Sequence, residues 1–166
     1  MLICSNLDEF YDVIFHVGSS YIKGNTSVLK ARSQYFEAML SVRHGYLESS
    51  GPIYYDKGRD SSFRVIKVEG VPKEFFNCII QYLYSDHFYI GQQSVEFFIQ
   101  LLIYADYFMV PRIGQICSKY IRQFICLGNV LSVLLVAHAH NAADLELFCI
   151  DFICLHEQEI VNSQDW

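Results

Sequence analysis

Three histidines near the carboxyl end come closest to a metal site by residue type. His138 and His140 stand two residues apart, and His156 follows later in the chain. Imidazole nitrogens are common zinc ligands, but a site needs several of them converging on one ion. The segment around His138 has helical spacing, and residues two apart on a helix point roughly 200° from one another. We therefore predict surface histidines, with no metal and no cofactor.

The cysteines and serines do not form a catalytic pattern. No two cysteines are separated by the two residues typical of a metal knuckle, and no serine occupies a Gly-x-Ser-x-Gly turn. No glycine-rich phosphate loop is present either. We predict that the chain is not an enzyme and that its thiols are reduced and packed as small apolar groups. The six cysteines are Cys4, Cys78, Cys117, Cys126, Cys149 and Cys154.

The composition predicts one folded domain that leaves apolar surface for a partner. Of the 166 residues, 52% are hydrophobic and only 18% are charged, against about 25% charged in an average soluble domain. So little charge suggests that a partner covers part of the apolar surface. The net charge is −6 and the Lys and Arg residues are scattered, which argues against a nucleic-acid partner.

No segment has the pattern of a secretion signal or of a membrane span. Residues 1–5 have no basic start and only a short apolar run. The longest apolar-rich segments, 97–109 and 130–139, fall short of about 20 residues. We expect no membrane span, and a location in the cytoplasm, the nucleus or both, where thiols stay reduced.

The spacing of apolar residues predicts an α+β fold. Alternation of Val13, Phe15 and Val17 indicates a strand, whereas recurrence at three and four residues indicates helices. The first half reads as a strand over 12–17, a return strand over 21–23, a helix over 28–40 capped by Thr26-Ser27, and a long loop over 41–62. The second half reads as a strand over 64–69, a helix from Pro72 to Ser85, a short strand over 87–90, and helices over 94–108, 111–124, 130–140 and 143–155.

These segments resemble the BTB/POZ domain family. The opening strand carries the family's Asp-Val pair as Asp12-Val13, and the first core helix reads Val-Leu-x-Ala-Arg-Ser-x-Tyr-Phe over 28–36. Further matches are Tyr82-Leu83-Tyr84, Ala105-Asp106-Tyr107-Phe108 and Ile116-Cys117-Ser118-Lys119-Tyr120-Ile121. The resemblance implies a small three- to four-stranded sheet flanked by a helical cluster, with a C-terminal helix pair.

The helix pair is similar to the 3-box, the beginning of a BACK domain, that follows BTB domains in cullin-3 adaptors. The matching residues are Asn129-Val130-Leu131, Ala137-His138, Ala143-Asp144-Leu145 and Cys149-Ile150-Asp151-Phe152-Ile153. The ending, with Val161, Ser163 and Trp166, is most similar to the speckle-type adaptors that join a MATH domain to a BTB domain. We therefore expect a BTB/POZ domain over 6–126 and a 3-box, or partial BACK helix pair, over 127–166.

The resemblance implies a non-catalytic adaptor. Such adaptors commonly form homodimers and bind the cullin-3 N-terminal domain, and so link a substrate protein, read by regions outside this chain, to a cullin-RING E3 ubiquitin ligase. Their hydrophobic-x-Glu motif matches Tyr46-Leu47-Glu48 here. We expect the cullin-binding residues to be Tyr46, Leu47, Glu48, Asp86, His87 and Tyr107. The alternative, that Tyr46 only anchors a loop, stays open.

Two departures from the family pattern affect the expected partners. The family's basic residue before the core helix is replaced by Thr26, which cannot give Asp12 a positive partner and so disfavours a corepressor groove. The apolar helix on which the family's dimer is built is represented by at most its last turns. The expected dimer interface comprises Leu2, Ile3, Leu7, Phe10 and Val13. An oligomerisation scaffold without cullin binding, in a transcription factor or structural protein, remains the alternative.

Overall fold

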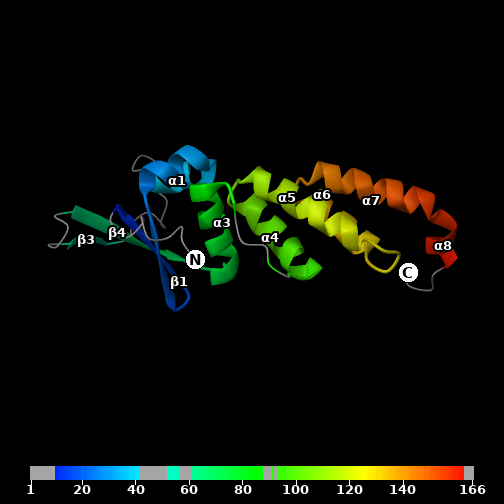
Figure 1. The fold of residues 1–166 in the computed structure, drawn as a ribbon, viewed down its shortest axis with the longest axis horizontal. Coiled ribbons are helices and arrows are strands. Elements are labelled where there is room, and N and C mark those ends of the chain that lie inside the picture. The colour runs from blue at the N-terminus through cyan, green and yellow to red at the C-terminus, as the bar shows by residue number, and fades with distance from the viewer. Residues whose placement is uncertain (1–9, 42–51, 57–60, 88–90, 92, 163–166) are drawn as a thin grey trace. The chain divides into compact units, whose positions relative to one another are not determined.

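The computed structural model describes residues 10–41, 52–56, 61–87, 91 and 93–162. It contains two compact units, Met1–Tyr89 and Ile90–Trp166. The first unit combines a sheet with helices, and the described part of the second is helical (Figure 1). The predicted α+β class with a small sheet and a helical cluster is confirmed.

The sheet of the first unit has four strands in the order β2-β1-β4-β3. They are β1 (Val13–Val17), β2 (Ser20–Gly24), β3 (Ile53–Asp56) and β4 (Ser61–Val68). β1 is antiparallel to β2 and parallel to β4, and β3 is antiparallel to β4. The strand predicted from the alternation of Val13, Phe15 and Val17 is present as β1, and all three side chains are buried.

Three helices complete the first unit: α1 (Thr26–Arg32), α2 (Gln34–Leu40) and α3 (Lys73–Ser85). The single helix predicted over 28–40 is wrong at one residue, because the extended backbone of Ser33 ends α1 and caps α2. The Ser33 side chain accepts a hydrogen bond from the Phe36 N–H at 3.3 Å. The predicted cap at Thr26-Ser27 is also wrong, since the Asn25 side chain accepts from the N–H groups of the first turn.

Other element boundaries also differ from the predicted ones, and those of β3 and β4 differ because the two strands pair in the sheet. The loop predicted over 41–62 contains β3, and β4 begins at Ser61 rather than at Arg64, since the two strands pair with each other. Pro72 precedes α3 as its cap residue instead of lying in its first turn. The strand predicted over 87–90 falls mostly outside the described residues.

The second unit consists of five α-helices and a 3-10 turn among the described residues. They are α4 (Val95–Tyr107), α5 (Pro111–Ile121), the 3-10 helix η4 (Arg122–Phe124), α6 (Val130–Ala139), α7 (Ala143–Leu155) and α8 (Glu157–Asn162). Ser94 caps α4 and Pro111 opens α5, as predicted. The predicted helix over 111–124 changes to 3-10 geometry at Arg122, and α8 was not predicted.

The packing of these helices positions the C-terminal pair. α4 packs on α5, where the Phe98 and Tyr120 rings stack with centroids 4.7 Å apart. α7 packs on α5 and α6, and α6 also contacts α4. The pair α6–α7 is therefore held against α4 and α5, which we call the body of the second unit.

The turn between α4 and α5 holds a methionine in a left-handed conformation. Met109 has φ 52°, and the turn is closed by the Val110 N–H donating to the Ala105 carbonyl at 2.8 Å. A left-handed conformation costs a residue with a Cβ roughly 1–2 kcal/mol. Since the Met109 side chain is exposed, little burial would be lost on removing it.

We expect Met109→Gly to stabilise the protein by about 0.5–1 kcal/mol, after the extra freedom of glycine in the unfolded chain is subtracted. Thermal unfolding would measure this as a higher midpoint. Met109→Ala is the matched control, because alanine removes the same side chain and keeps the unfavourable φ. An alanine variant as stable as the glycine variant would contradict the expectation.

Candidate protein-interaction site

A furrow in the second unit runs between α4, α5 and the corner that joins α6 to α7. It has a volume of about 240 Å³. Its polar lining comes from Asp106, Gln115, Ser118, His140, Asn141 and Asp144. The furrow therefore mixes polar and apolar lining, since Leu102, Pro111 and Ala142 also line it, as many protein-binding surfaces do.

Asp106 of α4 fixes the α6–α7 corner. The His140 Nδ1 lies 3.1 Å from Asp106 Oδ2, and the Asn141 amide donates to Asp106 Oδ1 at 3.3 Å. Because a carboxylate only accepts, the His140 Nδ1 carries the proton in this arrangement. Asn141 adopts φ 55°, a conformation that asparagine tolerates better than most residues. One side chain thus holds both residues of the corner.

Arg122 fixes the start of α7. Its guanidinium donates to the Asp144 carbonyl and lies over the Phe148 ring, 5.2 Å from the ring centroid. Its Nε is buried and has no hydrogen-bond partner among the described residues. The face of α7 turned toward the body buries Leu145 and Cys149. Burial raises the pKa of the Cys149 thiol, although the nearby Arg122 charge opposes this.

Tyr107 directly follows Asp106 at the end of α4. Its ring is about half exposed and packs edge-on against Phe108 with centroids 5.0 Å apart. An exposed tyrosine offers apolar area with few rotors to freeze and a polar tip. Of the expected cullin-binding residues, Tyr107 is the one that lies in the second unit next to a furrow residue.

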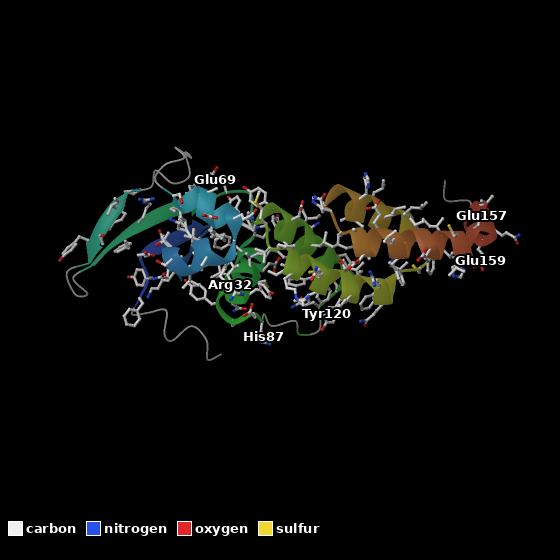
Figure 2. The ribbon with its side chains drawn as sticks, turned by 90° about the horizontal axis from the view of Figure 1, so that it is seen from above. Arg32, Glu69, His87, Tyr120, Glu157 and Glu159 are labelled. Atoms are coloured by element: carbon white, nitrogen blue, oxygen red, sulfur yellow. The ribbon has the colours of Figure 1, made fainter. Side chains whose placement is uncertain are left out.

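Asp86 and His87 lie together at the end of α3 in the first unit. Asp86 adopts φ 59° as the cap of α3 and pairs with Arg32. Figure 2 labels Arg32 and His87. The His87 Nδ1 lies 2.7 Å from the Ser85 carbonyl. Both partners of the Arg32–Asp86 pair are partly exposed, so the pair adds little stability. Tyr46, Leu47 and Glu48 lie outside the described residues.

Of the residues expected at the dimer interface, some lie outside the described residues and the others differ in exposure. Leu2, Ile3 and Leu7 lie outside the described residues. Phe10 is 72% exposed and presents apolar surface, whereas Val13 is 0% exposed. The assignment of Val13 to a dimer surface needs correction, because its side chain belongs to the core of this chain.

Asp12 accepts hydrogen bonds from Thr26, the residue that stands where the resemblance leads us to expect a basic one. The Thr26 N–H donates to Asp12 Oδ1 at 2.7 Å and the Thr26 hydroxyl donates to Oδ2. Both groups line a depression of about 290 Å³, together with Leu40, Ile53, Phe63 and Arg64. Sequence reasoning missed Arg64 here, since its approach depends on the parallel pairing of β1 with β4. The depression is therefore lined by one acidic and one basic residue together with apolar ones.

The histidines lie beside carboxylates. His138 pairs with Glu146 at 2.9 Å, and His156 lies 3.4 Å from Glu159. No group of three or more metal-ligating side chains gathers in the part of the chain that the structure describes. Over the same part, none of the helices has the length and apolar character needed to cross a bilayer.

The thiols differ in environment, from buried to exposed. Burial, with a smaller contribution from Glu74, raises the pKa of the Cys78 thiol from 9.0 to about 11. At pH 8 its thiolate fraction is then about 100-fold smaller than at the ordinary pKa, partly offset by the stronger nucleophilicity of a more basic thiolate. We expect iodoacetamide to modify Cys78 about 10-fold or more slowly than the exposed Cys154, as followed by peptide mass mapping. Equal rates would contradict the partial burial of Cys78.

Comparison with known proteins identifies the family. The model of the BTB/POZ domain family matches residues 4–125. The chain is 28% identical over 151 residues to BTB/POZ domain-containing protein 9 of Drosophila melanogaster, covering 91% of this chain and 19% of that protein. It is 24% identical over 159 residues to BTB and MATH domain-containing protein 42 of Caenorhabditis elegans, covering 95% and 35%.

Two further similarities agree with this. Kelch-like protein 40a of Danio rerio is 24% identical over 166 residues, covering 99% of this chain and 24% of the relative. The chain thus spans about a fifth to a third of the length of these relatives. The solved BTB domain of zebrafish PATZ1 has the same fold, with a TM-score of 0.50 and 21% identity over 68% of this chain and 76% of that one. Since the family model covers well over half of the residues, the chain belongs to the BTB/POZ domain family.

Proposed function

We propose that this chain is the adaptor domain of a cullin-RING E3 ubiquitin ligase. In this proposal it forms a homodimer, recruits the cullin-3 N-terminal domain, and brings a substrate that other regions recognise. Residues 127–166 are then the 3-box that begins a BACK domain. The domain acts without catalysis of its own, in the cytoplasm, the nucleus or both.

The observation that carries the proposal is the anchored helix pair with an accessible furrow beside it. Asp106 and Arg122 tie α6 and α7 to the body, and the furrow remains between the pair and the helices α4 and α5. A domain that only dimerises has no need for this pair, whose anchoring requires burial worth several kcal/mol. A helical segment of a partner could contact the furrow rim and the exposed Tyr107 ring.

The relatives support an adaptor that is one part of a longer protein. The names of two of them, a BTB and MATH domain-containing protein and a Kelch-like protein, join the BTB family to a second kind of domain. Such a domain would supply the substrate recognition that we place outside this chain. The identity of the substrate depends on that second domain.

Isothermal titration of the chain with purified cullin-3 N-terminal domain tests the proposal. We expect a dissociation constant in the micromolar range or below, and absence of binding at micromolar concentration would contradict the proposal. Tyr107→Ala, and Tyr46→Ala combined with Glu48→Ala, should each weaken binding about tenfold, which corresponds to about 1.4 kcal/mol. Tyr21→Ala is the control, because Tyr21 is also exposed but lies on β2, outside the expected site.

The second candidate is an oligomerisation scaffold that does not bind cullin-3. The edge strand β3 favours it, since Ile53, Tyr54 and Tyr55 are all exposed there. An apolar edge strand is a surface on which another chain can pair. Light scattering separates the two candidates: a stable dimer that ignores cullin-3 supports the scaffold.

A further inference from the structure

Helices α6 and α7 are apolar on both faces, but each buries only one. Val130, Val133 and Ala137 of α6 are buried, and so are Leu145 and Cys149 of α7. A helix that is hydrophobic all round is normally covered all round. On the outward sides Leu135 is 71% exposed and Leu147 is 61% exposed. The pair therefore presents uncovered apolar surface.

The outward side chains lie in two stripes. Leu131 and Leu135 are four apart on α6, while Leu147, Ile150 and Cys154 follow the 3-4 spacing of a heptad on α7. His138, one turn after Leu135, pairs with Glu146, the neighbour of Leu147, at 2.9 Å. This contact places the stripes side by side. We call the five residues Leu131, Leu135, Leu147, Ile150 and Cys154 the α6–α7 face.

With histidine counted as neutral, every charged side chain within α6, α7 and α8 is acidic. All twelve Lys and Arg residues lie at or before Arg122, where they balance twelve of the eighteen acidic residues. The net charge of −6 therefore belongs to the last 44 residues. Glu146 and Asp151 flank the α7 stripe at the positions that set partner choice in coiled coils. Glu157 and Glu159 on α8 continue the acidic charge (Figure 2).

The acidic charge favours some binding partners of the α6–α7 face over others. A second copy of the chain would bring Glu146 and Asp151 against the same acidic residues, whether the helices ran parallel or antiparallel, and like charges across an interface are unfavourable. An anionic membrane surface is disfavoured for the same reason. A helix with Lys or Arg beside its apolar stripe would instead complement both the apolar stripes and their acidic borders.

We propose that the α6–α7 face docks one amphipathic helix of a partner protein, with apolar residues at heptad spacing flanked by Lys or Arg. The proposal goes beyond cullin-3 recruitment and does not depend on it, because none of the five face residues lines the furrow. The partner helix would lie along α7 and contact α6 with one edge. Its basic residues would meet Asp151 and Glu146.

Two designed peptides test the proposal on the whole chain. Both are three-heptad helices with Leu at the two seam positions; one carries Lys and the other Glu at the flanking positions. Fluorescence anisotropy should show micromolar binding of the Lys peptide that weakens with salt, and at least tenfold weaker binding of the Glu peptide. Equal binding of the two peptides, or binding of neither, would overturn the proposal.

Variants locate the binding. Leu147→Ala with Ile150→Ala should weaken the Lys peptide at least tenfold, whereas Ile53→Ala with Tyr54→Ala, a pair exposed on β3, should leave it unchanged. Glu146→Gln with Asp151→Asn should reduce the salt dependence. Circular dichroism would verify that each variant folds. No effect of the Leu147 and Ile150 changes, or competition by saturating cullin-3 N-terminal domain, would overturn the assignment of this face to a separate partner.

Discussion

Replacing Phe76 with alanine is expected to lower the free energy of unfolding by about 3–5 kcal/mol, the range for truncating a buried phenylalanine. Phe76 of α3 is fully buried and lies against Phe15 of β1, with ring centroids 5.1 Å apart. Phe36 of α2 completes the cluster, 5.6 Å from Phe15 and 6.3 Å from Phe76. The three rings join a strand to two helices, so the cavity would lie where these elements meet.

The effect is large against the 5–15 kcal/mol by which most domains are stable. Urea unfolding followed by circular dichroism would show a lower midpoint at an unchanged slope. Phe10→Ala is the matched control, because it removes the same side chain from an exposed position; we expect a change below about 0.5 kcal/mol. A loss below about 1 kcal/mol for Phe76→Ala would mean that this cluster does not hold the first unit together.

Local signals in the sequence account for much of the fold. The alternation of Val13, Phe15 and Val17 predicted β1, and the signals at Ser94 and Pro111 predicted where α4 and α5 begin. The failures arise where a distant segment decides the structure. β3 forms because it pairs with β4, and its own sequence is short and lies between polar, glycine-containing stretches.

The break between α1 and α2 at Ser33 shows a different limit of prediction from sequence. Apolar spacing continues across 28–40, so periodicity alone predicts one helix. The structure instead uses Ser33 as the end of one helix and the cap of the next, which changes the direction of the chain while the apolar residues on both sides stay buried. Serine favours this role because its side chain can bond to a nearby backbone N–H.

The sequence predicted which helices form the candidate site, but it did not predict which residues hold them together. The sequence indicated the helix pair, and the family resemblance supplied its expected role and the expectation for Tyr107. The exposure of the Tyr107 ring is known only from the structure. The anchors of the pair, Asp106 and Arg122, emerge only from three-dimensional proximity, since Asp106 meets residues 34 and 35 positions away. No local pattern distinguishes Arg122 from the exposed Arg112 on the preceding helix.

Arg122→Ala is expected to release α7 from the body without unfolding the rest of its unit. The change removes a charge-assisted hydrogen bond to the Asp144 carbonyl and a cation–π contact with Phe148. Together these are worth about 2 kcal/mol or more. Cys149 reports the opening, because its side chain is fully buried on the inward face of α7. A 2 kcal/mol loss should raise the rate of Cys149 alkylation about 30-fold if modification requires local opening.

Two comparisons make this experiment specific. Arg112→Ala removes the same side chain from an exposed position where it bonds to Gln115 at 2.8 Å, and it should change the Cys149 rate less than about twofold. Cys117, buried in α5, is the internal control. If Cys117 accelerates as much as Cys149, the whole unit has been destabilised and Arg122 is not a local anchor. If Cys149 alone accelerates, titration of the same variant with the cullin-3 N-terminal domain tests whether the proposed recruitment depends on a fixed helix pair.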